Sequence, residues 1–303
     1  MSKIFQVVMI GLLLVGCNPK SDDALNIMVP LGAPSIPFID LMNDETVNLT
    51  FVNGTDPLLA AFINPNQELD IIVAPMNIGI SLLNRESTNY KLWGVLTWGN
   101  LVVVAPNSDA LEHHGQLALF GQNTIIEHIS EQILYPLSPS LDPVYYPSVA
   151  DAFVSLMSNK SEAALLAQPF AQVAIYQAAQ QNKELKIILD VAQAYKQATG
   201  LDNYPQAAIF ILDSSYQSKQ VAIDKVLTNI DTYIRLIHQS PEQLELDLNR
   251  LDASTLGLPQ AAILTPIIDQ LHLRLVNAQQ AEKQINALLD MLGLSISEQM
   301  ILN

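Results

Sequence analysis

Short apolar runs alternate with amphipathic stretches along most of the chain. The runs at 25–30, 47–52 and 69–74 have the length of strands, and each leads through a turn containing Gly, Pro, Asn or Asp into a stretch with helical spacing. Their even spacing along the chain is typical of βαβ units with parallel strands buried on both faces. The pattern therefore predicts an α/β fold.

The same pattern predicts two lobes. Two further strand-like runs, 90–97 and 101–105, follow without an intervening helix, and the chain changes character at Pro106. A second α/β set then has strands expected at 116–120, 144–146, 162–167 and 185–189. The apolar run 204–212 carries the chain back, and from Ser218 onward the pattern is helical throughout.

We therefore predict a two-lobed α/β fold in which each lobe is a mainly parallel sheet flanked by helices. Lobe 1 comprises residues 25–105 and 205–303, and lobe 2 comprises residues 106–204. The crossings between lobes are expected near Ala105–Ser108 and Asp202–Pro205, because the repeating unit changes there in both directions.

Several helix ends carry capping signals. Ser148 is expected to cap the helix that follows it, with Asp151 in the first turn. Gly200 stands where the helix 191–199 should end. Ser240-Pro241-Glu242-Gln243 has the spacing of a capping box, and the apolar positions of 278–292 fall on one face of a helix expected on the outside of lobe 1.

The first sixteen residues have the form of a secretory signal. One Lys precedes a short apolar stretch, which is too short to span a bilayer and stops at Leu14-Val15-Gly16-Cys17. These four residues resemble a lipobox, so we expect residues 1–16 to be a signal peptide, Cys17 to be lipidated and 17–24 to be a tether. The alternative is an ordinary secretory signal with a chance cysteine.

Composition narrows the location and the partners. The formal net charge of −16 makes nucleic acid an unsuitable partner, since like charges repel. No second apolar run is long enough to cross a membrane, and Cys17 is the only cysteine, so no disulfide framework is expected. We expect an exported globular body, held at the cell membrane by its N-terminal lipid and facing outside the cytoplasm.

Three local segments carry a resemblance to a known family. They are Gly32-Ala33-Pro34-Ser35 after the first strand, Leu69-Asp70-Ile71-Ile72-Val73-Ala74-Pro75 at the third, and Ala164-Leu165-Leu166-Ala167-Gln168-Pro169-Phe170 in lobe 2. With the lipobox and the inserted second lobe, the chain resembles type II periplasmic binding proteins of the sulfonate, nitrate and thiamine-pyrimidine group, which are substrate-binding components of ABC transporters.

The resemblance implies a solute-binding protein that acts as a monomer. It captures a small molecule between its lobes, closes by a hinge motion and delivers the molecule to an ABC permease and its ATPase. It also implies that ligands contact the turns after the strands, and helix N-termini there offer unpaired N–H groups. The expected ligand-binding residues are Gly32, Ala33, Pro34, Ser35, Gly54, Thr55, Asp56, Pro75, Met76, Asn77, Thr97, Trp98, Gly99, Asn100, Gly121, Asn123, Thr124, Tyr146, Gln168 and Pro169.

Several of these residues have two interpretations. Ser35, Thr55 and Thr124 stand at helix starts, where a hydroxyl either caps the helix or contacts a ligand. Trp98 precedes the first crossing and could stack on a ligand, whereas Trp93 is expected in the core. Tyr145 and Tyr146 alternate faces, so at most one of them points toward the ligand.

The sequence gives little support for catalysis or metal binding. Asp56 and Asp70 could form an acid–base pair, but each stands in an ordinary structural position. His113 and His114 are adjacent on a polar loop without a third ligand at metal-binding spacing. No phosphate loop, nucleophile elbow or zinc-protease motif occurs. We therefore expect no catalytic residue, no metal and no cofactor.

The identity of the ligand stays open between two classes. The predicted turns hold no Arg or Lys, which favours a neutral planar heterocycle such as a thiamine-precursor pyrimidine, while a sulfonate remains an alternative. Gln168 stands where the family frequently has an acid, so the resemblance does not imply an amine held at that point. Two further readings are a lipoprotein receptor for a sensor or partner protein and a lyase-like enzyme on the same fold.

Overall fold

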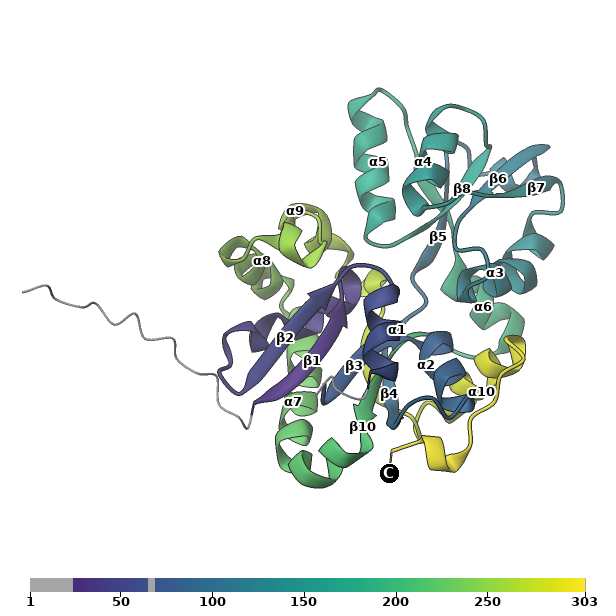
Figure 1. Ribbon diagram of the computed structural model, residues 1–303. Coiled ribbons are helices and arrows are strands. Elements are labelled where there is room, and N and C mark those ends of the chain that lie inside the picture. Colours follow the sequence, from purple (N-terminus) through teal and green to yellow (C-terminus); the bar gives the residue numbers. More distant parts are fainter. Residues whose placement is uncertain (1–23, 65–68, 303) are drawn as a thin grey trace, which may run out of the picture.

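The computed structural model describes residues 24–64 and 69–302, which form two α/β lobes (Figure 1). The predicted signal peptide, the predicted lipidation site Cys17 and nearly all of the predicted tether lie outside the described residues. The two-lobed α/β architecture predicted from the sequence is confirmed. No described helix is both long enough and apolar enough to cross a membrane.

Lobe 1 contains a six-stranded sheet in the order β11-β4-β10-β3-β1-β2. Its strands are β1 (Leu25–Pro30), β2 (Val47–Val52), β3 (Ile71–Pro75), β4 (Tyr90–Trp98), β10 (Pro205–Leu212) and β11 (Leu273–Asn277). β1 pairs in parallel with β2 and β3, whereas β10 runs antiparallel to β3 and β4, and β11 runs antiparallel to β4.

Lobe 2 contains a five-stranded sheet in the order β7-β6-β8-β5-β9. Its strands are β5 (Leu101–Ala105), β6 (Gly115–Leu119), β7 (Leu141–Tyr145), β8 (Ala163–Ala167) and β9 (Lys186–Asp190). β6 pairs in parallel with β7 and β8, and β5 runs antiparallel to β8 and β9. Both sheets are therefore mixed: β10 and β11 run against the other four strands of the first sheet, and β5 runs against the other four strands of the second.

Helices cover both faces of each sheet. Those of lobe 1 are η1 (Ala33–Asn43), α1 (Asp56–Ile63), α2 (Met76–Asn84), α7 (Asp213–Gln239), α8 (Pro241–Arg250), η5 (Ala253–Leu256), α9 (Ala261–Leu264), η6 (Thr265–Leu271), α10 (Glu282–Met291) and η7 (Glu298–Met300). Those of lobe 2 are η2 (Ala110–Glu112), α3 (Ile125–Ile129), the π-helical η3 (Ser130–Leu134), η4 (Tyr135–Leu137), α4 (Val149–Met157), α5 (Phe170–Gln180) and α6 (Val191–Thr199).

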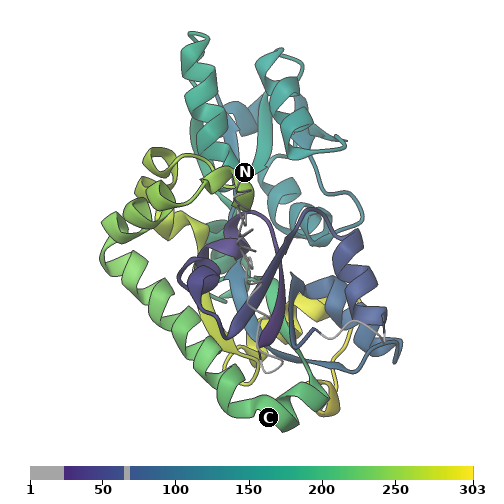
Figure 2. The same ribbon diagram turned by 60° about the vertical axis from the view of Figure 1, so that its left-hand side comes forward.

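Alternation along the central strands explains why both faces of the first sheet are covered. Ile71 and Val73 belong to the core that packs with α7, whereas Ile72 and Ala74 belong to the core on the opposite face with α1 and α2. Figure 2 shows α7 running the length of lobe 1 on its own side of the sheet. A continuous apolar run therefore corresponds to a strand buried on both sides.

The first crossing lies earlier in the chain than the sequence indicated. We assigned Leu101–Ala105 to lobe 1 because it follows β4 without a helix, but as β5 it pairs with β8 and β9 of the second sheet. The chain thus passes between the sheets at Gly99-Asn100. It returns at Pro205, where β10 begins. Apolar content alone could not tell which sheet β5 would join.

The C-terminal region is not helical throughout. β11 interrupts it and pairs antiparallel with β4 at the edge of the first sheet. Its five residues include Arg274, and so short a segment does not stand out from the surrounding helical spacing. α10 packs its apolar face, Ile285, Leu288 and Leu289, on the core shared with β4 and β10, as expected.

Two of the three predicted caps form. Ser148 Oγ accepts the Asp151 N–H at 3.2 Å, and Gly200 ends α6 in the left-handed conformation (φ 76°). The Ser240 side chain makes no capping hydrogen bond, although Pro241 does begin α8. There the main-chain carbonyl of Ser240 accepts the Gln243 N–H at 2.9 Å instead.

A buried ion pair ties α7 to the first sheet. The Lys219 ammonium lies 3.1 Å and 3.3 Å from the two carboxylate oxygens of Asp70, and one of these oxygens also accepts the Asn26 N–H at 2.8 Å. The Asp70 side chain is 5% exposed and that of Lys219 is 31% exposed. Removing the carboxylate charge leaves an ammonium that is largely desolvated.

We expect Asp70→Asn to lower the free energy of unfolding by about 1–3 kcal/mol, because a partly buried ammonium loses its partner. Urea denaturation of the purified protein measures this. Asp231→Asn is the matched control, because it breaks the exposed pair with Arg235 (3.0 Å) and should cost less than about 1 kcal/mol. Equal losses in the two variants would contradict a structural role for the Asp70 pair.

Candidate functional site

The two sheets turn the carboxyl ends of their parallel strands toward one another. β1, β2, β3 and β4 all run in the same direction, because β10 is antiparallel to both β3 and β4. The carboxyl end of β4 leads through Gly99-Asn100 directly to Leu101 of β5, which pairs with Ala167 at the carboxyl end of β8. The turns after β6, β7 and β8 therefore face the turns after β1, β2 and β3.

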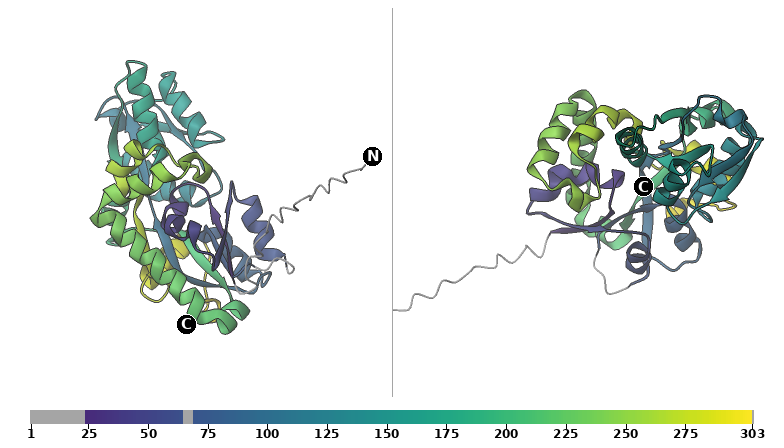
Figure 3. Two further views of the ribbon diagram at one scale, coloured as in Figure 1. Left: turned by 90° about the vertical axis from the view of Figure 1, so that its left-hand side faces the viewer. Right: turned by 90° about the horizontal axis from the view of Figure 1, so that it is seen from above.

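The topology thus gathers the predicted ligand turns at two facing edges. On lobe 1 these are the turns after β1, β2 and β3, and on lobe 2 those after β6, β7 and β8. The edges meet where the Gln168 side chain donates to Gln270 Oε1 of η6 at 2.7 Å. Figure 3 shows from the side that α9 and its neighbours lie at the end of lobe 1 nearest lobe 2.

The turn after β1 is closed by its own hydroxyl. Ser35 is fully buried, and its hydroxyl lies 2.8 Å from the Gly32 carbonyl oxygen and 3.3 Å from that of Leu256. Gly32 itself has φ 92°, a conformation that favours glycine. Ala33 is buried and Pro34 is half-buried. The Ser35 hydroxyl therefore holds the turn in shape.

The next two turns of lobe 1 are more open. Gly54, Thr55 and Asp56 are exposed, and the Thr55 hydroxyl makes no capping bond to α1. After β3, Pro75 and Asn77 are half-buried, whereas Met76 is fully buried in the core. At the turn after β3, the groups available to a ligand are therefore main-chain groups and the Asn77 side chain.

The turn after β6 begins α3 with a formed cap. Thr124 Oγ1 accepts the Ile126 N–H at 3.2 Å and donates to the Gly121 carbonyl at 2.5 Å. The Thr124 hydroxyl therefore caps α3. Gly121 and Asn123 both have positive φ, and the Asn123 N–H donates to Glu127 Oε2 at 2.6 Å. A carboxylate therefore already occupies the first turn of α3.

Tyr145 and Tyr146 have separate partners, as their alternation predicts. The Tyr146 hydroxyl lies 2.7 Å from Ser155 Oγ, and that of Tyr145 lies 2.9 Å from the Tyr135 hydroxyl. Burial is the main cause that raises the pKa of Tyr145, and the hydrogen bond with Tyr135 adds to it. Both phenol hydroxyls are therefore engaged by other side chains of lobe 2.

Gln168 is the predicted residue that joins the two lobes most directly. It is 2% exposed and precedes a cis peptide bond to Pro169. Its N–H donates to the Asn100 carbonyl at 3.0 Å, and its carbonyl accepts from Asn100 Nδ2 at 2.8 Å. Gln168 thus links the first crossing to Gln270 of lobe 1, a partner that the sequence did not indicate.

The two crossings touch each other. The Gly99 N–H donates to the Tyr204 carbonyl at 2.9 Å, and a side chain on Gly99 would fall 2.0 Å from the Tyr204 ring. Asn203 Nδ2 and His272 Nδ1 both lie within hydrogen-bond distance of the Gly99 carbonyl, at 3.1 Å and 2.5 Å. Thr97 is buried, and its hydroxyl accepts the Ala207 N–H at 3.1 Å.

Trp98 is held against Arg274 at the end of β4. Its indole N–H donates to the Arg274 carbonyl at 2.9 Å, and the Arg274 guanidinium lies 4.4 Å from the centre of its ring. Only 1% of Trp98 is exposed, so one face of the ring is already covered by a cation. Trp93 packs against the core of the first sheet, as predicted.

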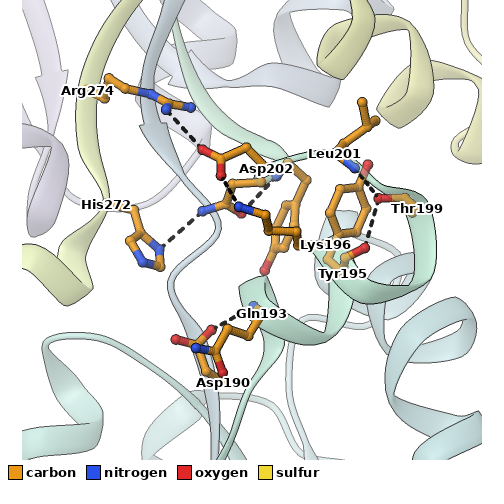
Figure 4. A network of polar contacts seen from close by, with 11 residues as sticks. Asp190, Gln193, Tyr195, Lys196, Thr199, Leu201, Asp202, His272 and Arg274 are labelled. Atoms are coloured by element: carbon orange, nitrogen blue, oxygen red, sulfur yellow. Dashed lines mark hydrogen bonds and ion pairs between the residues drawn. The ribbon is translucent and has the colours of Figure 1, made fainter.

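Asp202 connects the lobes at the second crossing. Its two carboxylate oxygens lie 2.9 Å from Lys196 Nζ of α6 and 3.1 Å from an Arg274 nitrogen of β11 (Figure 4). These contacts hold the pKa of Asp202 below its ordinary value, and the contact with Lys196 has the largest effect. One exposed carboxylate therefore bridges a helix of lobe 2 and a strand of lobe 1.

Two cavities lie between the lobes beside these crossings. The crossing cavity, of about 260 Å³, is lined by Asn100, Leu101, Val102, Ile187, Asp190, Gln270 and His272. The hinge hollow, of about 610 Å³, is lined by residues of both lobes that include Trp98, Asp190, Lys196, Asp202, His272 and Arg274. Of these side chains, only Asn100 and Trp98 were predicted from the sequence to contact a ligand.

The paired carboxylates and the adjacent histidines do not form sites together. Asp56 follows β2 and Asp70 precedes β3, so these two acids lie at opposite edges of the sheet, and Asp70 pairs with Lys219. His113 lies 3.4 Å from Asp109 and 3.6 Å from Glu162. Within residues 24–64 and 69–302, no three His, Cys, Asp or Glu residues are grouped as metal ligands.

Solved structures of similar shape are numerous, although no protein-family model and no curated protein match the sequence. An ABC transporter from Parabacteroides distasonis is 21% identical, with a TM-score of 0.72, covering 89% of this chain and 92% of its own. The periplasmic aliphatic sulphonate binding protein SsuA from Escherichia coli is 16% identical, with a TM-score of 0.66 and 93% of both chains covered.

The alkanesulfonate-binding protein SsuA from Xanthomonas axonopodis pv. citri, bound to MOPS, has a TM-score of 0.59 and 12% identity over 93% of this chain and 95% of its own. At such identities the likeness establishes the fold. The predicted resemblance to type II periplasmic binding proteins is confirmed at that level.

The ion pairs of Asp202 predict a dependence of stability on pH. The folded-state pKa of Asp202 lies below the ordinary 3.8, so its contribution is present above about pH 4 and is lost as pH falls through the folded value. The side chain is 53% exposed, so we expect at most about 1 kcal/mol. We therefore expect the melting temperature of the wild type to fall more than that of Asp202→Asn when the pH is lowered from about 5 to about 3. Thermal unfolding at the two pH values measures this.

Lys196→Gln serves as the companion variant, because it removes the first partner while the carboxylate stays. It should reduce the pH dependence in part. An identical loss of stability in the wild type and in Asp202→Asn would show that the bridge contributes nothing.

Proposed function

We propose that this protein is a solute receptor that binds a small molecule between its lobes and delivers it to an ABC importer. The observation that carries the proposal is the arrangement of the two facing edges. Two sets of parallel strands, joined by short crossings at Gly99-Asn100 and Asp202–Pro205, turn their carboxyl ends toward one another. Ligands of open α/β sheets bind beyond the carboxyl ends of the strands.

The mechanism we propose is closure about these crossings. Few main-chain bonds have to turn for one lobe to move against the other, and a ligand that contacts both edges favours the closed form by its differential affinity. The permease then recognises the closed form. In this proposal the protein binds without chemical change and reaches the membrane through the lipid on Cys17, after export from the cytoplasm.

The ligand contacts we propose are the predicted turn residues on both edges. Gly32, Gly54, Asn77, Gly121 and Gln168 stand at or beside the strand ends, where main-chain N–H groups and amide side chains can meet a ligand. These turns hold no Arg or Lys. The proteins of similar shape named for sulfonates show that the fold accommodates such ligands, but here we favour a neutral or planar heterocyclic solute.

Thermal unfolding with a panel of solutes tests the proposal. The panel contains pyrimidine and thiamine precursors, sulfonates, nitrate, purines, amino acids and polyamines. A ligand at about a thousand times its Kd adds roughly 4 kcal/mol of stability, which raises the melting temperature by several degrees. One saturable shift, with the compound recovered unchanged, supports a solute receptor.

Two asparagines of α2 locate the binding edge. Asn77 lies in the first turn, at the facing edge, and Asn84 lies at the far end, where its side chain donates to the Ser295 carbonyl at 2.9 Å. Asn77→Ala should reduce the shift and Asn84→Ala should not. Turnover of the compound would instead favour an enzyme, and no shift across the panel would favour a receptor for a partner protein.

A further inference from the structure

Asn100, one of the residues that line the crossing cavity, has a buried acceptor without a partner among the described residues. Asn100 is 6% exposed, and its Nδ2 is committed to the Gln168 carbonyl at 2.8 Å. That contact fixes the amide orientation, so Oδ1 is the atom left on the other side. Oδ1 is buried and makes no hydrogen bond within the described residues. Buried polar atoms are nearly always hydrogen-bonded, so this acceptor suits a donor from outside the chain.

Asp190 adds a negative charge to the same cavity. One of its carboxylate oxygens accepts the Gln193 N–H at 3.1 Å and caps α6. Among the described residues Asp190 forms no ion pair, whereas Lys196 and Arg274, which line the hinge hollow with it, both pair with Asp202. The pKa of the Tyr204 phenol is raised, mainly by burial and further by the negative charge of Asp190. Asp190 and Asn100 thus both line the crossing cavity.

The two remaining polar side chains of the cavity, His272 and Gln270, are engaged by neighbouring residues. His272 Nδ1 lies 2.5 Å from the Gly99 carbonyl oxygen and 3.2 Å from Asn203 Nδ2, so this nitrogen is engaged at the crossing. Gln270 Oε1 accepts from Gln168 Nε2 of the other lobe at 2.7 Å, so the Gln270 acceptor is engaged and its Nε2 is a donor. No Lys or Arg lines the cavity. A sulfonate would meet the Asp190 carboxylate, with no Lys or Arg among the described lining residues to balance its charge.

We propose that the crossing cavity binds the N–H donor group of the solute, a protonated amine, an amidine or guanidine, or the amino edge of a heterocycle. The donor group would bond to the Asp190 carboxylate between the two lobes, and closure on the solute would bring Asn100 Oδ1 into reach as the second acceptor. At about 260 Å³ the cavity takes a small head group rather than a whole large ligand. This inference rests on the proposed function and adds the class of solute to it.

A series of probes with one alkyl chain and different head groups tests the class. The probes are butylamine, butylguanidine, 1-butanol and 1-butanesulfonate, and ligand-observed NMR or calorimetry on the purified protein gives their Kd values. We expect the amine and the guanidine to bind at least about tenfold more tightly than the alcohol and the sulfonate, because charge-assisted hydrogen bonds are the stronger ones. Tightest binding of 1-butanesulfonate would overturn the class while the solute-receptor function stands.

Two acid-to-amide variants locate the site. Asp190→Asn keeps a good capping residue for α6 and removes the charge, so affinity for the amine should fall about 10- to 100-fold with little change in melting temperature. Asp44→Asn is the matched control, because Asp44 also holds a turn, accepting the Thr46 N–H at 2.8 Å, at the other edge of the first sheet. Amine affinity should be unchanged there. An Asp190→Asn variant that binds the amine as well as the wild type would overturn the site.

The panel of solutes separates failure of this inference from failure of the proposed function. If no probe binds but a panel solute with N–H donors does, the same two variants are measured with that solute and decide the question. If the bound solute has no N–H donor, the class is wrong and the receptor function stands. If no solute of any class binds, both proposals fall together.

Discussion

The packing of Gly99 against the Tyr204 ring is the contact on which the arrangement of the two lobes depends. The two crossings run side by side there, and a Cβ on Gly99 would lie 2.0 Å from the ring. Tyr204 is buried and packs edge-on against Tyr195 of α6, with their ring centres 5.2 Å apart. On the other side, Asn203 Nδ2 and His272 Nδ1 lie within hydrogen-bond distance of the Gly99 carbonyl oxygen. The direction in which each sheet leaves the crossings, and hence which edges face one another, follows from this junction.

Local pattern predicted most of the fold because most strands here are buried on both faces. The runs that became β1, β2 and β3 are apolar, evenly spaced and followed by turn residues, so period and length identify them. β5 and β11 show the limit of that signal. β5 was recognised as a strand, yet its partners β8 and β9 lie some sixty or more residues further along, and no local feature assigns it to a sheet. β11 is too short and too polar to stand out among helices.

The candidate site likewise contains residues that the local pattern predicted and residues that it could not predict. The turns after the strands were predictable, because strand direction alone gathers them at one edge of each sheet. The side chains of the crossing cavity were not, since Asp190, Gln270 and His272 come together only through the fold. Trp98 shows why, because its ring is covered by Arg274, 176 positions away, and nothing near Trp98 in the sequence announces that contact. Hydroxyls at the turns, such as Ser35 and Thr124, proved to be engaged with the main chain of their own turns.

The inserted second lobe also has a consequence for the order in which the chain can fold. Ribosomes deliver β1 to β4 first, but β10, which lies between β3 and β4 in the finished sheet, emerges only after all of lobe 2. Lobe 2 is one continuous segment and has all its strands once β9 has been made. Until β10 arrives, β3 and β4 each keep an unpaired apolar edge, the kind of edge that pairs with other chains. During synthesis the nascent half-sheet is therefore the part most open to pairing with other chains, whereas lobe 2 already has all its strands.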